Sequence, residues 1–99
     1  SMQRSAIVTA VPHGRGRTRQ ITIRNVGDEV ALELGIQFMA EKEDRTDWLL
    51  GTRPRVLGPG KEVCLEIAQT PGPTDCKLIV SWVDSRGNTS RWIGAISRR

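Results

Sequence analysis

The segment over residues 78–96 most strongly constrains what this chain can fold into. Leu78, Val80 and Trp82 recur at every second position, the periodicity of a β-strand with one buried face. Residues 84–88 (Asp-Ser-Arg-Gly-Asn) are typical of a turn, because Asp and Asn side chains bond to nearby backbone and Gly accepts positive φ. A second strand then returns to the end of the segment. We therefore predict a β-hairpin with Trp82 in the core.

Short alternating segments recur along the rest of the chain, separated by turn-forming residues. In chain order, the expected strands cover residues 6–11, 17–25, 31–39, 48–50, 55–57 and 62–68. We expect Pro12 to end the first strand and Gly27 to take positive φ in the turn after the second. Residues 58–61 (Gly-Pro-Gly-Lys) predict a tight turn. With the hairpin, these segments give about seven strands, typical of an antiparallel β-sandwich or a small barrel.

A helix is the main alternative for residues 30–45, which contain many good helix formers. Four apolar residues at strict spacing of two, from Leu32 to Phe38, argue against it, since a helix would spread them around its surface. We therefore expect a strand with these four side chains facing the core. Residues 41–47 follow as a charged loop that could hold one helical turn.

Ninety-nine residues are enough for one domain with a single core. The chain has four aromatic residues, so the core depends mostly on Ile, Val and Leu, which favour strands. Ser1 and Met2 resemble a tag remnant and a start residue. We expect residues 1–4 to be a tail and residues 5–97 to be a single domain. No segment has the length and apolarity of a membrane span, and none resembles a signal peptide.

Three segments resemble one group of domains. They are residues 21–32 (ITIRNVGDEVAL), residues 57–61 (LGPGK) and residues 78–87 (LIVSWVDSRG). They resemble the I-x-I/L-x-N-x-G-x-x-x-A segment, the L-x-P-G-E/K turn and the L-x-V-x-Y/W-x-D-x-x-G hairpin of bacterial immunoglobulin-like and fibronectin-type-III-like domains. The resemblance implies an immunoglobulin-like antiparallel β-sandwich with an adhesive or scaffolding role, and it carries over no catalytic residue. The chain departs from antibody-like domains because its second strand has no cysteine.

The two cysteines are expected to face opposite ways. Cys64 alternates with the inward-facing Val63 and Leu65, whereas Cys76 shares the phase of the buried hairpin strand. Side chains that face opposite ways do not satisfy disulfide geometry. Two free thiols favour a reducing compartment, so we expect the domain in the cytoplasm or on the cytoplasmic side of a larger protein, with an extracellular location as the alternative.

Arginines are concentrated near the two ends of the chain, whose net charge is +4. Arg15, Arg17 and Arg19 lie in a segment without acidic residues, and Arg98 and Arg99 end the chain. Guanidinium groups on one loop could contact phosphates with salt-dependent affinity. Nucleic-acid binding through residues 13–19 and the basic C-terminus is therefore the alternative function. The competing interpretation is a solubilising loop, since aromatic residues for base stacking are scarce nearby.

Trp48, Arg91 and Trp92 complete the candidate partner-binding residues. Trp48 follows the acidic loop and is either an edge plug or an interface anchor. Trp92 is expected on an exposed sheet face beside arginines, an arrangement that suits a protein interface.

Catalytic and metal-binding motifs are absent from the sequence. The single histidine, His13, lies in a loop rich in Gly and Arg, without an orienting partner. Residues 58–61 lack the spacing of a phosphate-binding loop, and no zinc or calcium motif occurs. We predict no enzyme activity, no cofactor and no metal. A small hydrolase is a third hypothesis with almost no support.

The leading hypothesis is a non-enzymatic protein-interaction or scaffolding module within a larger bacterial protein or complex. A sandwich without catalytic clusters still offers the backbone of its sheet edges to a partner strand. We expect the partner to be another protein or a flanking domain. A homodimer through a sheet edge is an alternative, and membrane insertion by this segment is not expected.

Overall fold

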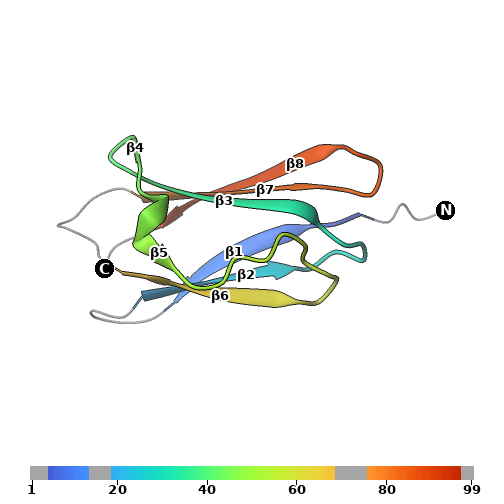
Figure 1. Cartoon of the computed structure of the whole chain (residues 1–99), viewed down its shortest axis with the longest axis horizontal. Helices are drawn as coiled ribbons and strands as arrows, with labels where there is room; N and C mark the ends of the chain where they lie inside the picture. Colours follow the sequence, from blue (N-terminus) through green and yellow to red (C-terminus); the bar gives the residue numbers. More distant parts are fainter. Residues whose placement is uncertain (1–4, 14–18, 69–75, 97–99) are drawn as a thin grey trace.

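The computed structural model describes residues 5–13, 19–68 and 76–96. Two antiparallel four-stranded sheets, ordered β1-β2-β6-β5 and β4-β3-β7-β8, face each other as a β-sandwich (Figure 1). The elements are β1 (Val8–His13), β2 (Arg19–Asn25), β3 (Leu32–Ala40), β4 (Glu43–Asp44), the 3-10 helix η1 (Thr46–Trp48), β5 (Leu49–Leu50), β6 (Glu62–Ile67), β7 (Cys76–Val83) and β8 (Thr89–Ile96). The predicted all-β antiparallel sandwich is confirmed.

The predicted hairpin is the pair β7–β8, in register from Cys76 opposite Ile96 to Val83 opposite Thr89. Trp82 is 5% exposed, and its indole N–H donates to the carbonyl oxygen of Ala6 at 3.1 Å. Because Ala6 lies just before β1, this bond connects the hairpin to the opposite sheet. The prediction that Trp82 belongs to the core is confirmed.

The turn between β7 and β8 depends on Asp84. Its Oδ1 accepts the backbone N–H groups of Arg86 and Asn88, each at 2.9 Å, and Gly87 takes a φ of +88°. The backbone hydrogen bond from Asn88, aided by that from Arg86, holds the pKa of the exposed Asp84 carboxyl below its ordinary value. Residues 84–88 therefore form the predicted turn.

The other sheet contributes the second half of the core. Ile21 and Ile23 of β2 and Leu65 of β6 are fully buried. Cys64 alternates with these inward-facing residues and is exposed on the outer face, whereas Cys76 is buried in β7, and the two cysteines form no disulfide with each other. The predicted facing of the two cysteines is confirmed.

The prediction that Pro12 ends the first strand is wrong. Strand β1 continues to His13, and Pro12 lies opposite Ile21. The N–H of Val26 donates to the carbonyl oxygen of Ile7, and bonded and non-bonded pairs alternate from there along an antiparallel ladder. This alternation places Pro12 in a non-bonded pair. A proline is tolerated at such a position of an edge strand, since its missing N–H would point away from β2.

Gly27 is required for space, and the prediction of positive φ at this residue is wrong. A Cβ atom at Gly27 would lie 2.2 Å from the carbonyl oxygen of Ser5 and 2.6 Å from the amide nitrogen of Ile7. The segment before β1 therefore packs directly on the backbone of the turn after β2.

The expected stripe of four inward side chains on β3 is interrupted by a bulge between Leu32 and Gly35. Glu33 takes a φ of +48°, and the inserted residue shifts the phase of the strand. Leu32 lies opposite the outward-facing Val83, while the fully buried Ala31 takes the inward position. The residues beyond the bulge face the core as predicted, but Leu32 does not.

The charged segment 41–47 is more ordered than a loop. Glu41 and Lys42, at φ values of 51° and 66°, form a two-residue turn between β3 and β4, and η1 follows. Residues 55–57 form no strand, because Leu57 makes an isolated bridge to Ala31. The tight turn at 58–61 is confirmed by the N–H of Lys61, which donates to the carbonyl oxygen of Gly58 at 3.1 Å.

Asn25, at the end of β2, is a fully buried polar residue. Its Nδ2 donates to the carbonyl oxygens of Glu29 at 2.7 Å and Leu57 at 2.9 Å. Its Oδ1 accepts the N–H groups of Gly27 at 3.0 Å and Ile7 at 3.3 Å. These four bonds use the full capacity of the amide and join three segments at one end of the sandwich.

Candidate functional site

Strand β8 is a long open edge of the sandwich. It is the last strand of its sheet, and it pairs with β7 along all eight of its residues. No strand of the described residues lies on its other side. Figure 1 shows β8 at the upper margin of the molecule, beyond β7. One side of its backbone is therefore available for pairing.

The hydrogen-bond alternation identifies which backbone groups of β8 face the open side. The N–H of Asp84 donates to the carbonyl oxygen of Asn88 at 2.9 Å, so this pair closes the hairpin as a bonded pair. Bonded and non-bonded pairs alternate from there along an antiparallel ladder. Four residues occupy non-bonded pairs and direct their N–H and C=O groups away from β7: Thr89, Arg91, Ile93 and Ala95.

The side chains of β8 divide between the two faces of its sheet. Trp92 lies opposite the buried Val80 and packs partly buried against the core. Its ring covers Gly94, since a Cβ atom at that glycine would lie 2.2 Å from the ring. On the outer face, Arg91 is exposed and Ile93 is 56% exposed. Trp92 therefore faces inward near the edge, which corrects the expectation that it lies on an exposed sheet face.

The other terminal strands of the two sheets are short or blunted. Strands β4 and β5 have two residues each. Strand β1 has six, but Pro12 removes one of its outward N–H groups. Natural edge strands are commonly protected by proline, lysine or short length. Strand β8 has no such protection, since Arg91 is its one charged residue and it contains neither proline nor lysine.

Trp48 lies away from β8, at the end of η1. Its ring is partly buried against the core, with its centroid 6.3 Å from that of Phe38. The guanidinium of Arg45 lies 5.4 Å from the centre of the Trp48 ring, a cation–π contact. Of the two alternatives from the sequence, this geometry matches the edge plug.

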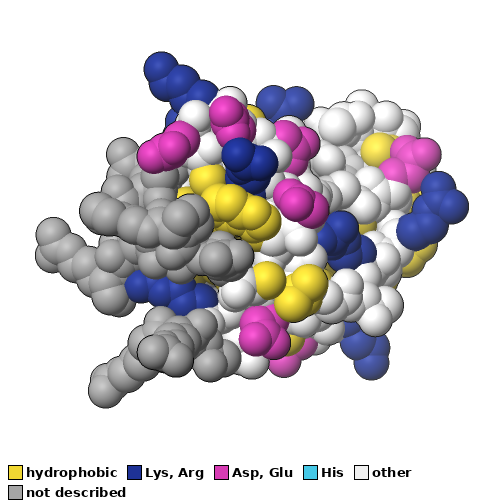
Figure 2. Space-filling view, turned by 60° about the vertical axis from the view of Figure 1, so that its left-hand side comes forward, with side chains coloured by type: hydrophobic (Ala, Val, Ile, Leu, Met, Phe, Trp, Pro, Cys, Tyr) yellow, Lys and Arg dark blue, Asp and Glu magenta, His cyan; other side chains and the backbone are white. Residues whose placement is uncertain are grey.

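The candidate arginines are not brought together in the described residues. Arg19 is half-buried in β2, in the sheet opposite Arg91. Arg15 and Arg17 lie outside the described residues, as do Arg98 and Arg99. On the face shown in Figure 2, basic and acidic side chains are interspersed, with acidic groups around a small hydrophobic cluster.

His13 and Asp44 each lie within hydrogen-bond distance of a threonine hydroxyl group. His13 is exposed, and its Nε2 lies 2.6 Å from the hydroxyl oxygen of Thr22. No group of three or more His, Cys, Asp or Glu residues in the described segments could hold a metal ion. The pKa of the exposed Asp44 carboxyl is lowered, chiefly by hydrogen bonds from Thr46. These bonds stabilise the loop after β4 and create no reactive group.

Two side chains of β8, Arg91 and Trp92, could be identified from the sequence as candidates, but the features that make β8 a site could not. The open edge depends on the order of strands in the sheet, which no local pattern reports. Ile93 was missed because the expectation of an exposed Trp92 assigns its neighbour to the buried face.

No family model and no curated protein matches the chain. Among solved structures, it is similar to the archaellum periplasmic stator protein FlaG from Sulfolobus acidocaldarius, with a TM-score of 0.47 and 13% sequence identity. The match covers 89% of this chain and 100% of that chain. It gives no support to a bacterial source, since that organism is archaeal.

The expectation of a cytoplasmic location is contradicted by this comparison, because the similar protein is named as periplasmic. We do not retain that expectation. The thiols were a poor guide to the compartment: Cys64 faces outward and Cys76 is buried, so geometry keeps them apart in any redox environment. No helix within the described segments has the length and apolarity to cross a membrane.

Proposed function

We propose that this chain is a non-enzymatic protein-interaction module that binds an extended segment of a partner protein along β8. The observation that carries the proposal is the open eight-residue edge, with four residues whose backbone groups point away from β7. In strand addition, main-chain hydrogen bonds supply affinity and alternate side chains supply specificity.

The strand order supports an immunoglobulin-like domain. Taking the eight strands in sequence as A, B, C, C′, D, E, F and G, the sheets read A-B-E-D and C′-C-F-G. Immunoglobulin-like sandwiches divide their strands in this way. The order agrees with the three resembling sequence segments. Strand β8 then corresponds to the last strand, at the edge of its sheet.

The two faces of β8 define the side chains that an added strand should carry. The inward-facing residues of the added strand would contact the partly buried Trp92, and the outward-facing residues of the added strand would lie beside Ile93 and Ala95. From Trp92 to Ile96 both neighbourhoods are apolar, and the polar residues Thr89, Ser90 and Arg91 lie near the turn. We propose a β-branched or aromatic segment as the ligand, since such residues suit a pleated, half-buried surface.

Replacing Ala95 with proline tests the proposal, because it removes an outward N–H without breaking the β7–β8 ladder. The preceding Gly94 tolerates the restriction that proline imposes. Extended peptides are first selected from a display library on the wild-type domain. They should bind Ala95→Pro about tenfold more weakly, since one hydrogen bond of the ladder is lost and the proline ring obstructs the edge. Fluorescence anisotropy measures the affinities.

The matched control is Ala95→Val, which keeps the N–H and favours a strand. It should bind within about twofold of wild type. Equal binding by Ala95→Pro, or a selection that yields no binding peptide, would contradict strand addition. A second copy of the chain could itself supply the strand. Analytical sedimentation would identify that case if the wild-type domain is a dimer and the Ala95→Pro variant is a monomer.

Nucleic-acid binding remains the alternative function, and no observation in the described residues favours it. It predicts binding to single-stranded RNA or DNA that falls steeply with salt and is unaffected by Ala95→Pro. That result would replace strand addition as the proposed function.

A further inference from the structure

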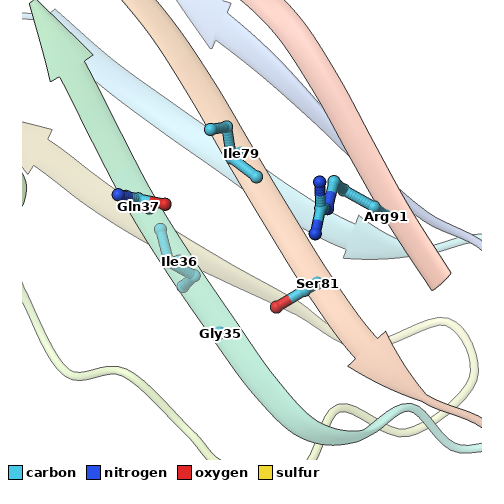
Figure 3. A pocket seen from close by; sticks show the side chains of 6 residues that line it. All are labelled: Gly35, Ile36, Gln37, Ile79, Ser81 and Arg91. Atoms are coloured by element: carbon cyan, nitrogen blue, oxygen red, sulfur yellow. The ribbon is translucent and has the colours of Figure 1, made fainter. Parts of the chain in front are cut away.

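A hollow of about 340 Å³ lies on the outer face of the sheet β4-β3-β7-β8, away from the core. Three adjacent strands line it through Gly35, Ile36, Gln37, Ile79, Ser81 and Arg91. Figure 3 shows the Arg91 side chain extending from β8 toward β7, on the same side of the sheet as Ser81 and Ile79. The hollow is a surface distinct from the backbone edge of β8.

The hollow exists because Gly35 has no side chain. The register places Gly35 opposite Ser81, and Ser81 opposite Arg91, in one row across three strands. A Cβ atom at Gly35 would lie 2.7 Å from the Ser81 hydroxyl oxygen. Gly35 does not take positive φ, so the backbone does not require glycine here. Its absent side chain leaves room beside the hydroxyl and the guanidinium.

Arg91 makes no ion pair or hydrogen bond within the described residues, and it is the one charged residue lining the hollow. A guanidinium presents a planar set of donors that matches a carboxylate, and the Ser81 hydroxyl can add another donor. The Gln37 side chain is already engaged, since its Nε2 lies 3.3 Å from Asp44 Oδ2. The available donors therefore converge from β7 and β8.

The next row on this face is apolar on two strands. Ile79 lies opposite Ile93, which is 56% exposed, and both stand on the same face as Arg91. A ligand that places an anion beside Arg91 would thus lay its neighbouring groups on isoleucine side chains. One unpaired positive charge matches a monoanionic carboxylate better than a phosphate dianion.

We propose that this hollow binds the carboxylate of an Asp or Glu side chain in a protein partner, with an apolar residue of the partner resting on Ile79 and Ile93. The site uses side chains of the sheet face, whereas strand addition uses the backbone of β8. The two proposals can therefore succeed or fail separately.

Nuclear magnetic resonance titration with three short peptides tests the site. The probes are N-acetylated, C-amidated Val-Glu-Val, Val-Gln-Val and Val-phosphoserine-Val. The Glu peptide should cause saturable shifts at the Gly35 and Ser81 amides and at the Arg91 side-chain N–H, and the Gln peptide should bind at least about tenfold more weakly, because charge-assisted hydrogen bonds are the stronger ones.

Variants localise the effect. Arg91→Gln should weaken Glu-peptide binding about tenfold, whereas Arg24→Gln, an exposed strand arginine in the other sheet, should leave it unchanged. Gly35→Ala should also weaken binding while circular dichroism stays that of wild type, and Ala95→Pro should bind normally. Equal binding of the Glu and Gln peptides, tighter binding of the phosphoserine peptide, or shifts that Arg91→Gln does not reduce would overturn the proposal.

Discussion

Replacing Asn25 with alanine is expected to lower the free energy of unfolding by about 3–5 kcal/mol, because it leaves three backbone groups around a fully buried side chain without partners. The carbonyl oxygen of Glu29 loses its donor, and the N–H groups of Ile7 and Gly27 lose their acceptor. The carbonyl oxygen of Leu57 loses one of its two donors and keeps the N–H of Ala31. Each orphaned buried group costs about 1–3 kcal/mol, less where water enters. Urea unfolding followed by tryptophan fluorescence measures the change.

Two further variants separate the amide from its volume. Asn25→Asp keeps the size but replaces Nδ2 with an oxygen that faces the carbonyls of Glu29 and Leu57, so it should be at least as destabilising as alanine. Asn88→Ala, at an exposed turn position, should cost less than about 1 kcal/mol. An Asn25→Ala domain within about 1 kcal/mol of wild type would show that this network contributes little to stability.

Trp82→Ala is expected to cost about 3–5 kcal/mol, the range for large aromatic residues removed from a core. Trp82 packs between the sheets with 5% of its surface exposed, and its indole bonds to Ala6 across the sandwich. Trp82→Phe keeps most of the ring volume and loses the hydrogen bond, so it should cost less than alanine. Chemical denaturation followed by circular dichroism measures both variants.

Trp92→Ala is the matched comparison for Trp82. Trp92 is partly buried near the open edge, so its truncation should cost less than that of Trp82. A cost below about 1 kcal/mol for Trp82→Ala would contradict the assignment of this residue as the centre of the core.

Local alternation was sufficient to predict the hairpin and the facing of most side chains. Cys64, Cys76 and Trp82 all lie as predicted, because a strand's two faces repeat every second residue regardless of its partners. The bulge at Glu33 was not predictable in this way, since it depends on pairing with β7, which lies far along the chain. Leu32 was therefore assigned to the wrong face.

Roles that depend on distant segments were also missed. Asn25 appeared in the sequence as the last residue of a predicted strand, yet two of its partners, Ile7 and Leu57, lie 18 and 32 residues away. Pro12 was predicted to end a strand because the local pattern does not show that β1 is an edge. The same limitation applies to the site: Arg91 was named, but the hollow beside it requires Gly35 from β3.

Hydrogen exchange of the β8 amides tests the open edge most directly. In the monomeric domain, the outward amides of Arg91, Ile93 and Ala95 should exchange at least about tenfold faster than those of Trp92 and Gly94, which bond to β7. A selected peptide that adds as a strand should slow the exchange of these outward amides. Equal protection of both sets in the monomer would show that the edge is already covered and would contradict the proposed function.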